Sequence, residues 1–269
     1  MKYTIKDLRK DFPNDDVCLD YIFAHKYNDT KGYHRVKGRK CYAHQSTGKQ
    51  IHPLAGTIFE KSSTSLTLWF HAIFLFASSK NGVSAKELQR QLGVTYKCAW
   101  RIAKQIRSLM EQGGDPLDGT VEVDETYYGK KGNEKTRFSN KATIVGAVER
   151  GENVRTKVVK DRSSMSIAPF VENNILKGSN LMTDEAPVYN EFARSYVKGT
   201  VHHARKEYVR GNIHTNSIEG FWGQFKRSVR GTHHFVSKKH LQSYLNEFAF
   251  RYNLRNSAVP VFSVLLERV

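Results

Sequence analysis

The sequence has few acidic residues for its size. Its 269 residues contain 26 Asp and Glu against 43 Lys and Arg, which gives a formal net charge of +17. So large a positive charge repels itself unless a polyanion is the partner, and nucleic acid is therefore the first expectation. An anionic membrane surface is the second, but no long amphipathic basic helix supports it.

Cysteine is also scarce, and there is no apolar run of membrane-spanning length. The longest such run, residues 66–77, is interrupted by His71 and is too short to cross a bilayer. The N-terminal residues lack the apolar core of a signal peptide. The three cysteines, at unrelated spacings, exclude a disulfide framework; they are Cys18, Cys41 and Cys98. We therefore expect a reduced, cytoplasmic protein without a membrane partner.

Residues 1–62 carry an incomplete zinc-binding pattern. The segment Cys41-Tyr-Ala-His44 is half of a zinc ribbon, which needs a second pair of ligands to complete a tetrahedral site. Only His25 and His34, at irregular spacing, could supply that pair. We predict a degenerate zinc-ribbon-like region that folds without bound zinc.

Residues 63–116 are predicted to be helical and to contain a helix-turn-helix. Ser84 with Glu87 indicates a capping box for the first helix, and Gly93 ends that helix. Thr95 caps a second helix that runs to about Met110. An ordinary helical hairpin with a solvated basic face is the alternative, but the turn, both caps and the basic face coincide.

The second helix of such a motif places its N-terminal residues in the major groove of DNA. We expect Trp100 to pack inward. The predicted DNA contacts on this helix are Tyr96, Lys97, Arg101 and Lys104.

The breaker cluster Gln112-Gly-Gly-Asp-Pro116 marks the next boundary, and residues 117–269 are predicted to form an α/β domain. The expected elements are strands over 120–129, 143–148, 154–159, 180–183 and 200–203, with helices over 165–176, 188–197, from 216 and over 238–253. This order predicts a sheet with helices on its faces, as in a ribonuclease-H-like fold.

Three acidic residues on separate elements of this domain suggest a site for divalent metal ions. Asp124 lies in the middle of a strand, where a carboxylate is costly to bury unless a cation or hydrogen bonds meet it. Asp184 ends a strand, and Glu219 lies near a helix start. Lys226 follows Glu219 by two helical turns, on the same face. In the alternative, Asn216 is the N-cap and Glu219 completes a capping box without any chemistry.

Three neighbouring acids, Glu122, Glu125 and Glu185, are alternative ligands. Glu125 and Glu185 are expected to point to the opposite side, because side chains alternate along a strand. Further DNA contacts are predicted in a basic loop and in the basic C-terminal part of the domain, at Lys130, Lys131, Lys226, Arg227, Arg230, Lys238 and Lys239.

Four motifs carry a resemblance to a known family: Val-Asp-Glu-Thr-Tyr-Tyr-Gly129, Met-Thr-Asp-Glu185, His214-Thr-Asn-Ser-Ile-Glu-Gly-Phe-Trp222 with Lys226, and Glu247-Phe-Ala-Phe-Arg-Tyr-Asn253. Together they resemble the bacterial insertion-sequence transposases of the ISXO2-like, IS1595 type. The resemblance covers nearly the whole chain. It implies a ribonuclease-H-like domain in which Asp124, Asp184 and Glu219 form a DDE triad, with Lys226 beside it.

The resemblance further implies two divalent ions, Mg²⁺ or Mn²⁺, held by the triad, with Lys226 touching a phosphate. The implied partners are the terminal inverted repeats of the element and target DNA, bound by a homodimer or larger assembly in the bacterial cytosol. Family members usually carry two Cys-x2-Cys pairs in the N-terminal region. Here the first pair is absent and the second survives only as Cys41 and His44.

Two other functions remain open from the sequence. A DNA-binding regulator could keep the fold without cutting, although it would have no need of buried carboxylates. A nuclease of the ribonuclease H type would cut DNA without joining ends to a target. Dependence of strand cleavage on a metal ion distinguishes the regulator, and strand joining distinguishes the nuclease.

Overall fold

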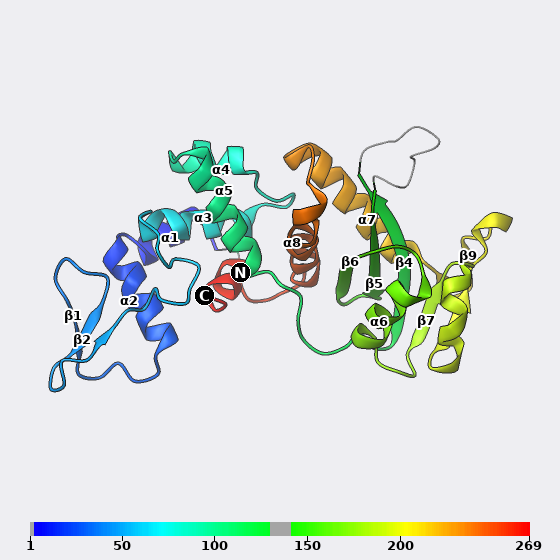
Figure 1. The fold of residues 1–269 in the computed structure, drawn as a ribbon, viewed down its shortest axis with the longest axis horizontal. Helices are drawn as coiled ribbons and strands as arrows, with labels where there is room; N and C mark the ends of the chain where they lie inside the picture. Colours follow the sequence, from blue (N-terminus) through cyan, green and yellow to red (C-terminus); the bar gives the residue numbers. More distant parts are fainter. Residues whose placement is uncertain (1–2, 130–140) are drawn as a thin grey trace. The chain divides into compact units, whose positions relative to one another are not determined.

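The computed structural model describes residues 3–129 and 141–269, which divide into two compact units (Figure 1). The first unit holds the residues up to Leu109 together with Ser257–Val269, and the second holds Met110–Asn256. The predicted DNA contacts Lys130 and Lys131 lie outside the described residues. In the described part of the chain, no helix combines the length and apolar character needed to span a membrane.

The first unit is mainly helical. Its helices are α1 Ile5–Asp11, α2 Asp15–Lys26, α3 Leu66–Ser78, α4 Ala85–Leu92, α5 Tyr96–Ser108 and α9 Val261–Leu266. A small antiparallel sheet joins β1 Tyr33–Arg35, β2 Tyr42–His44 and β3 Gln50–Ile51. The apolar helix α3 buries Trp69 and Phe70.

The last residues of the chain belong to this unit because of aromatic packing. The ring of Phe262 in α9 stacks on Tyr3 at 4.7 Å between centroids and contacts Phe70 edge-on at 6.5 Å. The sequence had placed residues 257–269 with the domain that starts at 117. Burial of Phe262 among these rings explains the difference.

Helices α4 and α5 form the predicted pair with a short turn. Gly93 ends α4 at φ 64°, in the left-handed region that favours glycine. Ser84 Oγ accepts a hydrogen bond from the Glu87 backbone at 3.1 Å. In a full capping box the Glu87 carboxylate would also accept from the Ser84 backbone N–H. Here it instead accepts hydrogen bonds from the side chains of Arg90 and Gln91.

The prediction that Trp100 packs inward is wrong. The buried face of α5 consists of residues spaced three and four apart, which are Ala99, Ile102, Ala103 and Ile106. Trp100 lies off this stripe and is 37% exposed, with the Lys104 ammonium 5.9 Å from its ring centroid.

The second unit contains a five-stranded mixed sheet. Its strands are β4 Thr120–Tyr128, β5 Ala142–Glu149, β6 Val154–Val159, β7 Asn180–Thr183 and β8 Val197–Thr200, in the order β6-β5-β4-β7-β8. Strands β4, β5 and β6 are antiparallel, whereas β4, β7 and β8 are parallel. This mixed α/β architecture is compatible with the predicted ribonuclease-H-like fold.

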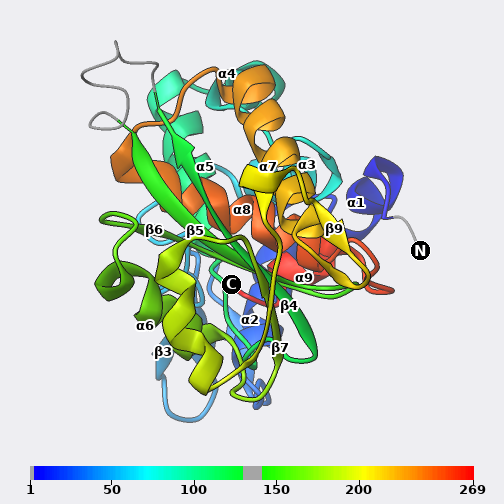
Figure 2. The same cartoon turned by 90° about the vertical axis from the view of Figure 1, so that its right-hand side faces the viewer.

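Both faces of the sheet are covered (Figures 1 and 2). Helices α7 Asn216–Ser228 and α8 Leu241–Asn253 cover one face, and α6 Ser164–Asn174 covers the other together with the 3-10 helix η2 Pro187–Arg194. The remaining elements are the 3-10 helices η3 His203–Arg205 and η5 Lys238–His240, the π-helical turn η4 Val229–His233, and the hairpin strands β9 Val209–Arg210 and β10 Ile213–His214.

Two predicted elements differ from the observed ones. The helix expected over 188–197 is the shorter 3-10 helix η2, and the following strand begins at Val197 rather than near residue 200. The register of β8 against β7, with Asn180 opposite Val197, fixes this start. Pairing with β7 therefore overrides the local helical pattern.

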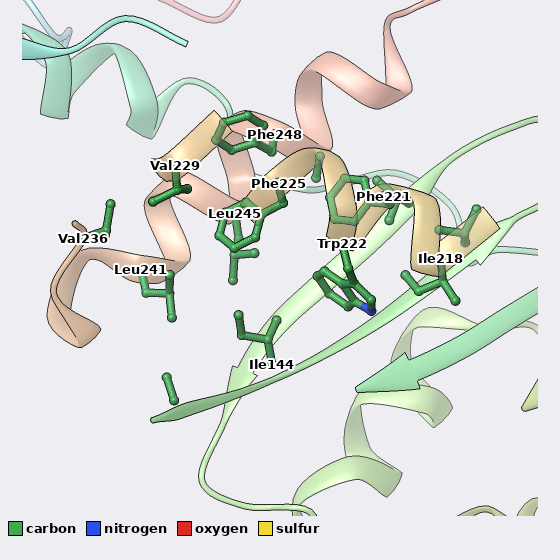
Figure 3. Close-up of a cluster of buried hydrophobic side chains, with 14 residues drawn as sticks. Ile144, Ile218, Phe221, Trp222, Phe225, Val229, Val236, Leu241, Leu245 and Phe248 are labelled. Carbon is green, nitrogen blue, oxygen red and sulfur yellow. The ribbon is translucent and has the colours of Figure 1, made fainter. Parts of the chain in front are cut away.

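Helix α7 approaches the sheet closely at Gly146 of β5. A Cβ atom at this glycine would lie 2.6 Å from the ring of Trp222 and 3.0 Å from Cδ1 of Ile218. Figure 3 shows Trp222 and Ile218 of α7 on the sheet side of the helix, in a core that also contains Ile144 and Phe225. Gly146 is also the partner of Asp124 across the β4–β5 pair. Because glycine has no side chain, α7 can lie close to β5 at the position that pairs with Asp124.

Candidate active site

One face of β4 runs alongside α7 from Glu122 to Thr126. Ser217 and Ile218 at the start of α7 donate to Glu122, and Lys226 in its last turn donates to Thr126 Oγ1. Four residues of strand and eight of helix both advance about 12–13 Å, so strand and helix stay in step. Because side chains alternate along a strand, Asp124 lies on this same face, between Glu122 and Thr126.

Asp124 lies on β4, and Asp184 lies just beyond the end of β7, the parallel neighbour of β4. Glu122 pairs with Met182 between β4 and β7. Continuing this register by two residues places Asp184, just beyond the end of β7, beside Asp124. Neighbouring strands are about 4.8 Å apart, so the two carboxyl groups lie within strong electrostatic range.

The environment of Asp124 disfavours its negative charge. Burial, followed by the charges of Glu125 and Asp184 and a further contribution from Glu219, raises the pKa of Asp124 to about 7. The structure therefore brings the three predicted carboxylates, from β4, β7 and α7, into one electrostatic cluster.

Glu219 lies in the first turn of α7 and is not the N3 residue of a capping box. The N-cap is Thr215, not Asn216 as in the alternative without chemistry, and Thr215 Oγ1 donates to Glu219 Oε1 at 2.8 Å. The Glu219 side chain is 48% exposed, and its Oε1 lies 3.9 Å from His203 Nε2. An exposed carboxylate at this position remains accessible to an incoming ligand.

The first free backbone amides of α7 are satisfied from another element, by the fully buried side chain of Glu122 in β4. Its carboxylate accepts hydrogen bonds from the backbone N–H groups of Ser217 at 2.7 Å and Ile218 at 3.1 Å. Arg150 Nε donates at 2.7 Å, Ser217 Oγ at 3.0 Å, and His214 Nδ1 lies 3.1 Å away. A carboxylate at a helix N-terminus is favoured by the exposed amides and the helix dipole.

The role of Glu122 was missed in the sequence. Glu122 lies two residues before Asp124 on the same strand face, and this spacing indicated that it points toward the site. The residues that donate hydrogen bonds to Glu122, however, are distant in the chain. Arg150 also donates to the backbone oxygens of Asn212 and His214, so it ties β5 to the segment that leads into α7. Glu122 and Arg150 together fix where α7 begins.

Lys226 shares the face of β4 with Asp124. Burial lowers the pKa of Lys226 from its ordinary value, with Asp124 acting in the opposite direction. The Lys226 ammonium therefore lies within the field of the carboxylate cluster while donating to Thr126.

Glu125 and Glu185 have other partners. Glu125 accepts from Tyr189 and is paired with Arg162. Glu185 accepts from the backbone N–H groups of His203 at 2.9 Å and Ala204 at 3.0 Å, and these bonds lower its pKa to about 2.

The predicted DNA contacts divide between the two units. On α5, Arg101 is partly buried and donates to the backbone oxygen of Glu60 at 2.9 Å. Tyr96, Lys97 and Lys104 are exposed on the same helix. In the second unit, the predicted contacts with exposed side chains are Arg227, Arg230, Lys238 and Lys239.

In the N-terminal region, Cys41 is buried, and the ring of His44 contacts Tyr33 edge-on at 4.9 Å. The candidate partner His25 lies near the backbone oxygen of Glu267. Across residues 3–129 and 141–269, no group of three or more His, Cys, Asp or Glu side chains is placed so that it could hold a metal ion by itself. Mg²⁺ is usually held by one or two carboxylates plus substrate phosphates. Asp124 and Asp184 fit this pattern as neighbours, and Glu219 acts on the charge of Asp124 and is open to solvent.

Comparison with known proteins places the chain in a transposase family. Residues 116–253 match the family described as ISXO2-like transposase domain, so the chain belongs to this family. A relative from Halobacterium salinarum, an uncharacterized protein in transposable element ISH50, is 26% identical over 244 residues, which span 82% of this chain and 80% of the relative.

The structure is also similar to a chain in a cryo-EM structure of a simian T-cell lymphotropic virus intasome bound to the PP2A regulatory subunit B56 gamma. The TM-score is 0.34 at 11% identity, covering 65% of this chain and 66% of that chain.

Proposed function

We propose that this transposase cuts DNA at the ends of its element and joins the 3′-OH ends to target DNA, with Asp124, Asp184 and Glu219 as the metal ligands. The convergence of three carboxylates from three elements, in a chain of net charge +17, carries this proposal. An uncompensated group of like charges is favourable only when a cation joins it.

The chain's own residues divide the work. Asp124 is central, since both Asp184 and Glu219 act on its charge. Lys226, on the same strand face, is placed to contact a phosphate oxygen. The divalent ions, Mg²⁺ or Mn²⁺, would supply activation of water or a DNA 3′-OH and stabilisation of the leaving oxygen.

DNA is the proposed partner of both units. The exposed Tyr96, Lys97 and Lys104 of α5 are proposed to contact the terminal repeats of the element. The exposed cations around α7 and η5 are proposed to contact the phosphate backbone near the cut. Assembly of two or more copies on the DNA would bring two ends together.

The test uses Glu219→Gln, because the exposed side chain can be changed without opening the core. Gln keeps an oxygen that accepts from Thr215, but a neutral amide is a poor ligand for Mg²⁺. We expect Mg²⁺-dependent cleavage of DNA carrying the element ends to fall by at least about 100-fold, the upper range for loss of an outer-shell metal partner. End binding and the unfolding midpoint should not change.

Glu172→Gln is the matched control, since Glu172 is exposed on α6, on the opposite face of the sheet. It should cut at the wild-type rate. Near wild-type cutting by Glu219→Gln would exclude Glu219 as a ligand. A wild-type protein that binds ends but never cuts would support the regulator, and one that cuts without joining would support the nuclease.

A further inference from the structure

The segment between β8 and α7 forms a hairpin whose outer side chains are both aromatic and basic. Strands β9 and β10 pair with Ile213 opposite Arg210 and His214 opposite Val209. The two-residue turn between them begins at Gly211, with φ 58°. Figure 1 shows β9 (yellow) at the outer edge of the second unit, beyond β7.

The inner side of the hairpin is fixed to the sheet. Ile213 lies over Gly199 of β8, where a Cβ atom would come within 3.1 Å of it. Arg210 donates to the backbone oxygen of Thr200 at 3.0 Å, and Arg150 donates to that of Asn212 at 2.7 Å. The hairpin is therefore held by its base rather than by its outer side chains.

The hairpin lies directly beside the carboxylate cluster. Glu185, which follows Asp184, accepts from the backbone of His203 at the start of η3. The His203 ring contacts the Tyr208 ring edge-on at 5.2 Å, and its Nε2 lies 3.9 Å from Glu219. The His203 side chain therefore contacts Tyr208 and also lies near Glu219, a proposed metal ligand.

The outer side chains expose both apolar and cationic groups. Tyr208 is 55% exposed and the adjacent Val209 is 53% exposed. We name as the hairpin surface the exposed residues Arg205, Lys206, Tyr208 and Val209. Positive charge interleaved with an aromatic ring is typical of surfaces that bind single-stranded nucleic acid.

We propose that the hairpin surface holds the DNA strand next to the scissile phosphate, with Tyr208 stacking on an unpaired base and Arg205 and Lys206 contacting phosphates. This proposal rests on the proposed function, because it takes the carboxylate cluster as the place of cutting. The charge of the surface and its contact with Glu219 through His203 select DNA over an apolar partner.

The test measures binding of full-length Asp124→Asn protein to an end duplex whose bases are unpaired at the cleavage site and carry 2-aminopurine there. Stacking on an aromatic side chain is worth enough that Tyr208→Ala should weaken binding roughly 5- to 140-fold. The 2-aminopurine signal should return toward that of free DNA. Tyr208→Phe keeps the ring and should match the parent protein.

Arg205→Ala should lower the salt dependence of binding by about one counterion. Leu176→Ala and Lys177→Ala are the matched controls. Both residues are exposed and precede the start of β7, whereas Asp184 follows its end. Neither should alter the 2-aminopurine signal.

Equal binding and equal fluorescence for Tyr208→Ala and Tyr208→Phe would overturn the proposal. So would loss of self-association in Tyr208→Ala with DNA binding intact, since the surface would then contact a second copy of the chain. In both cases the Tyr208 variants, with Asp124 restored, would still cut with Mg²⁺. Failure of the wild-type protein to cut end DNA would instead count against the proposed function.

Discussion

Glu122 and Asp124 lie two residues apart on one face of β4, and their surroundings are opposite. Around Glu122, a guanidinium, a hydroxyl and two backbone N–H groups compensate a fully buried charge. Around Asp124, the strongest neighbouring charges are the carboxylates of Glu125 and Asp184. The same residue class thus serves as a structural cap in one place and as a candidate metal ligand in the other.

The difference shows what distinguishes the two roles. A buried carboxylate with enough donors belongs to the fold, because its removal leaves those donors unpaired. A carboxylate whose pKa is raised by burial and by neighbouring negative charges destabilises the fold when it ionises, unless a cation binds beside it. Activity should therefore depend on Asp124 and stability on Glu122, and the following experiments test this division.

The largest expected effect is the loss of activity in Asp124→Asn. The amide removes a charge that the fold disfavours, so the free energy of unfolding at neutral pH should stay the same or rise. Mg²⁺-dependent cleavage should fall by at least about 100-fold in single-turnover assays on end DNA. Cleavage within tenfold of wild type would break the comparison, since Asp124 would then be no more than a polar strand residue.

The next effect is a loss of stability in Glu122→Ala. Arg150 and the Ser217 amide would lose their buried partner, and breaking a buried pair in this way costs about 3–5 kcal/mol. Urea unfolding followed by circular dichroism measures the change. Glu122→Gln, which keeps an acceptor for the amides, should lose less and should still cut DNA when folded. A cost below about 1 kcal/mol for Glu122→Ala would show that these donors find other partners.

Asp124 should add its own pH dependence to the stability of the fold. Its folded pKa of about 7 exceeds the unfolded value of 3.8, so the protonated form stabilises the fold and this contribution is lost as pH rises from about 4 to 7. The slope for one proton is at most about 1.4 kcal/mol per pH unit. Urea unfolding of metal-free wild type and of Asp124→Asn across this pH range isolates the contribution of Asp124. The same change of unfolding free energy with pH in both proteins would contradict the raised pKa of Asp124.

The smallest expected effect comes from Gly146→Ala, which tests the spacing between β5 and α7. The new methyl group would meet the Trp222 ring, and overpacking of this kind costs about 1–3 kcal/mol. The cost should shrink in a Trp222→Phe background, as a double-mutant cycle would show. Gly220→Ala on α7 is the control, because its Cβ meets nothing within 4 Å and alanine favours a helix interior. Equal costs in both backgrounds would mean that Trp222 does not set this distance.

Much of the local structure could be predicted from the sequence. Residues 154–159 and 180–183 have the bounds expected of them, because the apolar and β-branched residues of a strand and the turn residues that flank it are local signals. The inward orientation of Trp100 was wrong, since the buried stripe of α5 is set by neighbouring helices. Arg101 was predicted to contact DNA, and in the structure it donates to the backbone oxygen of Glu60, 41 residues away.

The sequence by itself determined that the three carboxylates lie on or beside three different elements, because strand alternation and helix caps depend on neighbouring residues. Which acids are neutralised was decided only by the tertiary structure. The donors that surround Glu122 come from residues 28, 95 and 96 positions away, so no local pattern separates it from Asp124. The close approach of α7 at Gly146 likewise depends on packing between β5 and a helix about 70 residues later.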